Sequence, residues 1–107
     1  MVQDKIAVII LNYNSSEETI NLISSIKRNE CNYYIIVVDN ASDKKDREKL
    51  SFIKNDVEIV YENENLGYAV GNNKGIKRAL ELGYRYLIIA NSDIEIIHKN
   101  TFAKMLF

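Results

Sequence analysis

Short polar stretches follow three apolar segments of this 107-residue chain, and they hold the side chains best suited to chemistry. Asn12 and Tyr13 follow the first of these segments, Asp39 ends the second and Asp93 follows the third. In an open α/β sheet, the carboxyl ends of the strands border the crevice where ligands bind. Polar residues that recur at the ends of three such segments therefore predict a binding site.

The two aspartates suit different tasks. Asp39 can accept hydrogen bonds from a nucleobase or from ribose hydroxyls, or it can, like Asn40, simply cap the following helix. Asp93 can give one oxygen ligand to Mg²⁺ or Mn²⁺, which often take one or two carboxylates plus substrate phosphates. Asn91 can support Asp93 through a hydrogen bond, and Glu95 shares its face if the segment is extended. A polar loop without a metal is the alternative interpretation.

The segment 65–75 (NLGYAVGNNKG) is rich in glycine and asparagine. Gly67 opens a predicted helix, and the free amides of a helix N-terminus can bind an anion. Gly71 and Gly75 inside this helix cost about 1 kcal/mol each relative to alanine. Such a cost predicts a close approach of the helix backbone to a strand or a ligand. The alternative is a tightly packed helix whose asparagines face solvent.

Tyr13 offers an aromatic ring at the end of the first apolar segment. Such a ring can stack on a nucleobase. It can equally cover the edge of the core, and the sequence alone leaves both interpretations open.

The apolar periodicity predicts the element order βαβαβαβ. This order is typical of an α/β fold with a Rossmann-like, mostly parallel sheet, flanking helices and right-handed crossovers. Strands are expected at 6–11, 34–38, 57–61 and 86–90, and the alternating pattern of the third favours a place near an edge of the sheet. Helices are expected at about 16–28, 43–54 and 68–82, with another beginning near 99.

Several residues should fix the ends and faces of the helices. Ser15 and Glu18 match a capping box, and Ser42 or Asp43 can cap the second helix. Gly83 stands where a left-handed cap would end the third helix. The side chains expected to face the core are Ile20, Ile23 and either Ile26 or the stem of Lys27 in the first helix, and Leu50 and Ile53 in the second.

Composition excludes several classes of protein. The net charge is −1, from 14 basic and 15 acidic residues, whereas nucleic-acid binding usually shows a basic surplus. The one cysteine allows no disulfide within the chain, so a cytoplasmic setting is the simplest expectation. The longest apolar run is far shorter than the roughly 20 residues that span a bilayer.

We expect residues 1–107 to form a single domain that is cut short at its C-terminus. Residues 101–107 end on an apolar stripe with nothing after them to cover it. The missing cover could be a C-terminal half or a second subunit.

Four segments together resemble the family 2 glycosyltransferases of GT-A fold. They are VIILNYN (8–14), IVVDNAS (36–42), NLGYAVGNNKG (65–75) and LIIANSD (87–93). The resemblance covers nearly the whole chain in order, and it is nearest to the rhamnosyltransferase-like branch that builds bacterial surface polysaccharides.

The resemblance implies a nucleotide-diphosphate-sugar donor, a divalent metal ion (Mn²⁺ or Mg²⁺) and a glycan or lipid-linked acceptor. The chain would then be the nucleotide-sugar-binding half of the enzyme, working in the cytoplasm or at the inner face of the membrane. The residues carried over by position are Asn12, Tyr13 and Asp39 at the nucleoside, Asn65, Gly67 and Asn73 in the donor pocket, and Asn91 and Asp93 at the diphosphate and metal.

The chain departs from the family pattern in two places. The first position of the family's Asp-x-Asp motif is Asn91, so Asp93 is the one carboxylate of the motif in this chain. The acceptor site and catalytic base of the family lie beyond this motif, so no residue here can be named as the base. The alternatives are a nucleotidyltransferase, which usually carries a glycine-rich basic loop after its first strand, and a non-catalytic nucleotide-binding or interaction domain.

Overall fold

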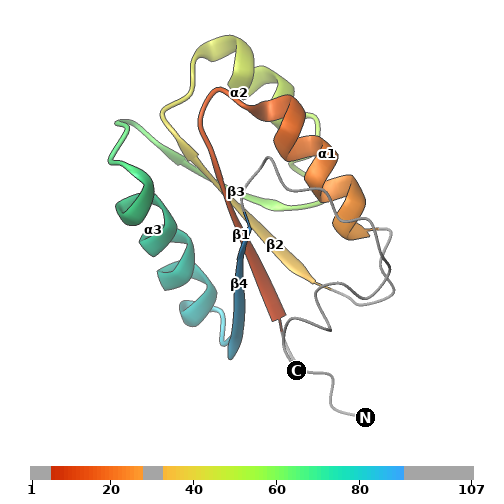
Figure 1. Ribbon diagram of the computed structural model, residues 1–107, viewed down its shortest axis with the longest axis vertical. Coiled ribbons are helices and arrows are strands. Elements are labelled where there is room, and N and C mark those ends of the chain that lie inside the picture. Colours follow the sequence, from red (N-terminus) through yellow and green to blue (C-terminus); the bar gives the residue numbers. More distant parts are fainter. Residues whose placement is uncertain (1–5, 28–32, 91–107) are drawn as a thin grey trace.

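The computed structural model describes residues 6–27 and 33–90 of the chain. Its strands and helices alternate as predicted (Figure 1). They are β1 (Ile6–Asn12), α1 (Ser16–Lys27), β2 (Tyr34–Asn40), α2 (Lys44–Ser51), β3 (Glu58–Glu62), α3 (Tyr68–Glu81) and β4 (Tyr86–Ala90).

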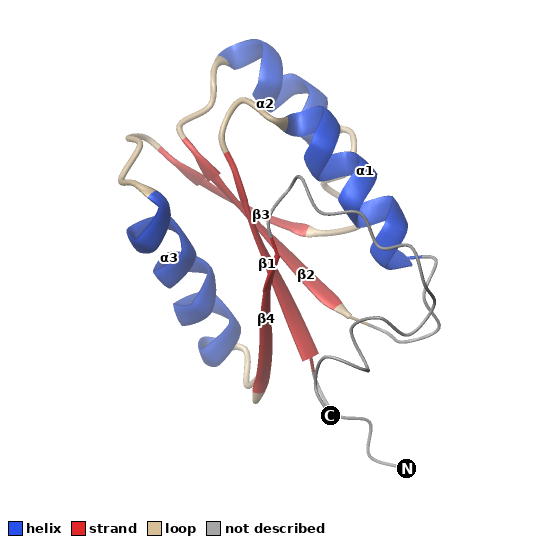
Figure 2. Cartoon of the chain, in the orientation of Figure 1, coloured by secondary structure: helices blue, strands red, loops and turns tan. Residues whose placement is uncertain are grey.

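The four strands form one parallel sheet in the order β3-β2-β1-β4. Helices α1 and α2 cover one face of this sheet and α3 covers the other (Figure 2). The central strands β1 and β2 are buried along most of their length, as expected for continuous apolar runs between two helical layers. Strand β3 is an edge strand, as its alternating sequence predicts, and β4 is the other edge of the described sheet.

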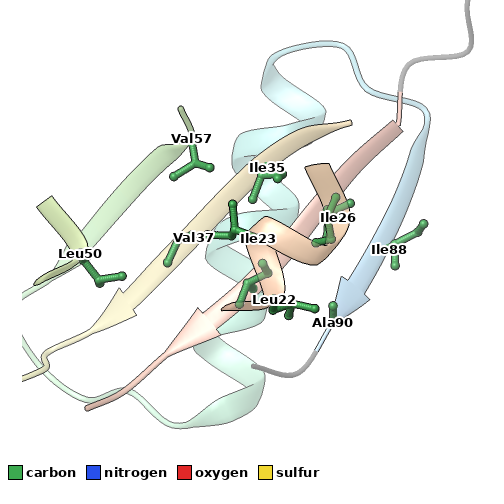
Figure 3. Close-up of a cluster of buried hydrophobic side chains, with 11 residues drawn as sticks. Leu22, Ile23, Ile26, Ile35, Val37, Leu50, Val57, Ile88 and Ala90 are labelled. Atoms are coloured by element: carbon green, nitrogen blue, oxygen red, sulfur yellow. The ribbon is translucent and has the colours of Figure 1, made fainter. Parts of the chain in front are cut away.

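The larger core cluster lies between the sheet and helices α1 and α2 (Figure 3). Ile23 and Ile26 of α1 belong to it as predicted, but Ile20 does not, and Leu22 takes the place expected for it. The reason is the rotation of α1 about its axis. Thr19 turns inward to donate a hydrogen bond to Asn12, which carries Ile20 toward the side of the helix.

Helix α3 lies close against β1 and β2 because two of its residues have no side chain. A Cβ atom built on Gly71 would lie 2.5 Å from Leu11 Cδ1, and one on Gly75 would lie 2.5 Å from Ile9 Cγ2 and 3.1 Å from Val38 Cγ2. The predicted close approach is therefore confirmed, and its partner is the sheet.

A polar cluster joins α3 to strands β2 and β3. Arg78 Nε lies 2.5 Å from Glu58 Oε2, and the Tyr34 hydroxyl donates to Glu58 Oε1 at 2.5 Å. The Tyr34 ring stacks on Tyr84 with 5.1 Å between the ring centroids. The hydrogen bond to Glu58, with burial and the Glu58 charge, raises the pKa of Tyr34 to about 12.

Two of the expected helix ends are confirmed. Asp43 is the N-cap of α2, and its carboxylate accepts the Asp46 amide. Gly83, at φ +89°, follows α3. Its amide donates to Leu80 O and the Tyr84 amide donates to Ala79 O, which is the paired pattern of a glycine C-terminal cap.

The predicted end of α2 near residue 54 is wrong. The α-helix ends at Ser51, and the chain continues through tighter turns in which the amides of Phe52 and Ile53 donate to Lys49 O and Leu50 O. Such i→i−3 bonds commonly finish a helix. Leu50 is buried and Ile53 is partly buried against the core, as predicted.

The helix expected to begin near residue 99 lies outside the described residues. Among the residues that are described, no helix combines the length and the apolar character that crossing a membrane requires.

Candidate functional site

The first polar residues of the predicted site come from neighbouring strands. Asn12 of β1 and Asp39 of β2 are register partners at the carboxyl ends of these strands. Asn12 Nδ2 donates to Asp39 Oδ1 at 2.9 Å, and neither side chain is exposed to solvent. The sheet therefore brings these two predicted residues together, below the surface.

The Asp39 carboxylate is fully engaged with hydrogen-bond donors. It accepts the Ser42 amide at 3.2 Å and the Ser42 hydroxyl at 2.5 Å, in addition to the amide group of Asn12. Arg47 of α2 supplies a counter-charge, because its Nε lies 2.8 Å from Asp39 Oδ2. A buried carboxylate is tolerable only when it is paired and hydrogen-bonded in this way.

Asn12 also connects β1 to both helices on its face of the sheet. Its Oδ1 accepts the Thr19 hydroxyl of α1 at 2.7 Å, and its Nδ2 donates to Asp46 Oδ2 of α2 at 2.9 Å. The second Asp46 oxygen accepts the Ser16 amide at 2.9 Å, at the start of α1. Burial raises the pKa of Asp46, but hydrogen bonds from Ser16 and Asn12 outweigh burial, so this pKa lies below its usual value.

The loop after β1 crosses above this network. Tyr13 is 50% exposed. Asn14 has a positive φ of 50°, its amide donates to the Ser42 hydroxyl at 2.8 Å, and its Oδ1 accepts the Asp43 amide at 2.8 Å. Tyr13 thus presents its ring on a loop whose backbone is fixed on both sides, which suits stacking on a planar ligand.

Asn40, the last residue of β2, holds a second loop on the opposite face of the sheet. Its Nδ2 donates to Asn65 Oδ1 at 2.9 Å and to Gly67 O at 3.2 Å, while its Oδ1 accepts the Leu66 amide at 3.1 Å. Gly67 lies at φ +86°, a conformation that favours glycine. Asn65 and Gly67 are exposed at the start of α3, which has no side-chain cap.

The paired asparagines of α3 face in different directions. Asn73 is exposed, as a ligand contact requires. Asn72 is only 5% exposed, and its Oδ1 is a buried oxygen without a hydrogen-bond partner. The solvent-facing alternative therefore holds for Asn73 and is wrong for Asn72.

The predicted site residues thus fall into three groups. Tyr13, Asn65, Gly67 and Asn73 are exposed, whereas Asn12 and Asp39 are buried beneath the first loop. Asn91, Asp93 and the neighbouring Glu95 lie outside the described residues. Within 6–27 and 33–90, no three histidine, cysteine, aspartate or glutamate side chains gather as they would around a metal ion.

Sequence reasoning missed four residues that organise the site. Asn40 and Ser42 stand in the motif 36–42, where helix capping was their only expected task. Asp46 and Arg47 lie in a charged run that reads as a solvated helix face. Their inward direction depends on how α2 packs, and only the i+3 spacing from Asp43 to Asp46 gave a local signal.

An open hollow of about 580 Å³ borders the network between α2 and Tyr61 of β3. Arg47 forms part of its wall, and its guanidinium carbon lies 5.1 Å from the centre of the Tyr61 ring. This cation–π contact with Tyr61 helps to keep the Arg47 guanidinium beside Asp39.

Residues 7–106 match the family model for glycosyl transferase family 2. The chain is 36% identical over 94 residues to the low-salt glycan biosynthesis hexosyltransferase Agl10 of Haloferax volcanii, covering 87% of this chain and 29% of the relative. It is 32% identical over 106 residues to the dTDP-rhamnosyl transferase RfbF of Shigella flexneri, covering 98% and 34%. The chain therefore spans about a third of the length of these relatives.

Solved structures share the fold. The mannosyltransferase PcManGT of Pyrobaculum calidifontis, in complex with GDP-Man and Mn²⁺, superposes with a TM-score of 0.82 at 17% identity, over 99% of this chain and 32% of its own. TarS 1–349 of S. aureus, in complex with UDP-GlcNAc, gives a TM-score of 0.78 at 21% identity, over 95% and 30%.

The family match covers nearly every residue, and it agrees with the resemblance carried by the four sequence segments. The chain belongs to glycosyl transferase family 2.

Proposed function

We propose that this chain forms the donor-binding part of a glycosyltransferase that moves a sugar from a nucleotide-diphosphate sugar to an acceptor hydroxyl. The observation that carries the proposal is the family match over residues 7–106, together with the polar residues at the carboxyl ends of β1 and β2. The two curated relatives are named as a hexosyltransferase and a rhamnosyl transferase, which supports a role in building a glycan.

The donor lies across the rim formed by the loops after β1 and β3. Tyr13 stacks on the base, because its ring is half exposed on a fixed loop. Asn65, Gly67 and Asn73 line the pocket from the start of α3. Exposed amide groups can recognise the hydroxyl groups of a ribose or a sugar.

Asn12 and Asp39 support this rim from below. Both are fully buried, so direct contact with the nucleoside requires the ligand to displace an existing hydrogen bond. Arg47 is the partner best able to leave, because its side chain is 30% exposed while that of Asp39 is not exposed at all.

Asn91 and Asp93 would contact the diphosphate of the donor. Asp93 would hold a divalent cation, Mn²⁺ or Mg²⁺, and such an ion stabilises the negative charge of a leaving diphosphate. We assign no catalytic base. We infer that the acceptor is a glycan or a lipid-linked glycan, and that the reaction takes place in the cytoplasm or at the inner face of the membrane.

The direct test is a titration of the chain with UDP, dTDP and GDP, each with and without Mn²⁺, followed by calorimetry or amide chemical shifts. We expect one nucleotide to bind, more tightly with Mn²⁺, and Asp93→Ala to remove the effect of the metal. Tyr13→Ala should weaken binding about 5-fold to 100-fold, as the loss of a base–aromatic stack worth about 1–3 kcal/mol predicts.

Tyr86→Ala is the matched control. Tyr86 is similarly exposed, at 46%, but it begins β4 at the opposite end of the sheet. Equal losses from the two tyrosine variants, or no binding of any nucleotide at millimolar concentration, would refute the donor site.

A further inference from the structure

A single carboxylate closes the loop that carries Tyr13. Asp46 lies on α2, yet its two oxygens accept hydrogen bonds from the residues on either side of the loop, Asn12 at the end of β1 and Ser16 at the start of α1. We propose that Asp46 is a positioning residue for Tyr13, because it fixes the loop that carries this tyrosine. The inference rests on the proposed function.

The geometry supports a direct link. Asn12 Nδ2 and the Ser16 amide each lie 2.9 Å from one Asp46 oxygen, across 34 and 30 residues of sequence. The three residues between these two points therefore form a short closed loop. Closing a loop at both ends removes most of the conformational freedom of the residues inside it.

A second connection fixes the middle of the loop to the same helix end. Asn14 Oδ1 accepts a hydrogen bond from the backbone amide of Asp43, the N-cap of α2. The backbone amide of Asn14 donates to the Ser42 hydroxyl. Residues 12, 14 and 16 are thus all bonded to segment 42–46, while the Tyr13 side chain is half exposed. The arrangement leaves the Tyr13 ring facing outward from a rigid backbone, which lowers the entropy cost of binding a ligand.

The position requires a carboxylate. An ionised carboxylate is acceptor-only, and the two groups that Asp46 joins across the loop, Asn12 Nδ2 and the Ser16 amide, are N–H donors. The side chains of Ser16 and Ser42 also hydrogen-bond to Asp46. Asp46 also lies at the positive N-terminal end of α1, where a negative charge is favourable. Asparagine in its place would turn an NH₂ group toward one of the two donors and lose that contact.

The test compares Asp46→Asn with Asp43→Asn. Both changes remove one negative charge from the start of α2. Asp43→Asn is the control, because Asp43 is the N-cap of this helix and asparagine caps a helix about as well as aspartate. We expect Asp46→Asn to speed hydrogen exchange of the Ser16 amide and to lower the NMR order parameters of residues 13–15. The Kd of the nucleotide that binds the wild-type chain should rise about 10-fold. Asp43→Asn should change none of these strongly, and Asp46→Glu should recover part of the affinity.

A double-mutant cycle separates positioning from general destabilisation. If Asp46 acts through Tyr13, Asp46→Asn has no further effect on the Kd in a Tyr13→Ala chain, since interacting residues give non-additive changes. An equal loss in both backgrounds, or an Asp46→Asn chain with unchanged loop order, overturns the inference. If the wild-type chain binds no nucleotide, the proposed function fails, and the loop order alone decides whether Asp46 holds Tyr13 in place.

Discussion

The two helical glycines of α3 should respond very differently to the same substitution. A Cβ at either position would lie 2.5 Å from a side-chain carbon of β1, so the initial clash is equal. At Gly75 the obstructing atom is Ile9 Cγ2, on a branched and fully buried side chain, and Val38 Cγ2 stands 3.1 Å away on the next strand. At Gly71 the obstructing atom is Cδ1 of Leu11, the far end of a flexible and partly exposed side chain.

The expected magnitudes follow from this difference. Overpacking a core costs about 1–3 kcal/mol, and exchanging glycine for alanine within a helix returns about 1 kcal/mol. At Gly75 neither neighbour can turn away, so the cost of overpacking should lie in the upper part of this range, at about 2–3 kcal/mol. Gly75→Ala should therefore lower the free energy of unfolding by about 1–2 kcal/mol after the gain in helix propensity. Gly71→Ala should change it by less than about 0.5 kcal/mol, because Leu11 can rotate toward solvent while the helix gains in propensity.

Urea unfolding followed by circular dichroism measures both values. For a domain of this size, a loss of 1 kcal/mol corresponds to a fall in melting temperature of roughly 4–8 °C. The reasoning is refuted if Gly75→Ala is as stable as the wild-type chain, or if Gly71→Ala is the less stable of the two variants.

Three further predictions concern single contacts. The pKa of Tyr34 is raised to about 12 in the folded chain, from about 10 when unfolded. The stability that this shift contributes is therefore complete below pH 10 and is lost as the pH rises toward 12. Glu58→Gln should lower the pKa of Tyr34, and a titration followed by absorbance at 295 nm would measure it. Asn40→Ala removes three hydrogen bonds to residues 65–67 and should cost about 2–3 kcal/mol, with faster amide exchange in this loop and little change in α1. Asp43→Ala removes the cap of α2 and should cost about 1 kcal/mol by urea unfolding, whereas Asp43→Asn should cost much less.

The architecture could be predicted from sequence because its signals are local. A continuous β-branched run such as 6–11 indicates a covered parallel strand, and Gly83 indicates a helix end without any knowledge of its neighbours. The inward stripe of α1 was harder, because the polar Thr19 sets the rotation of the helix through a hydrogen bond to another element. Helix propensity carries no information about such a bond.

The site was predictable only in part, for the same reason. The motifs located Asn12 and Asp39 correctly at neighbouring strand ends, but they did not show that both side chains are buried. That outcome depends on Asp46 and Arg47, whose charges resemble an ordinary solvated helix face in the sequence. The direction in which α2 presents them is a property of packing.

The two edges of the sheet differ in how they meet other molecules. Strand β3 begins and ends with glutamates that pair with Arg78 and Lys74, and charged edges discourage the addition of foreign strands. Strand β4 (YLIIA) carries no charge, pairs only with β1 among the described strands, and leaves Tyr86 and Ile89 nearly half exposed. Whatever lies against the second edge of β4 therefore decides whether its apolar side chains are covered or left to associate with another strand.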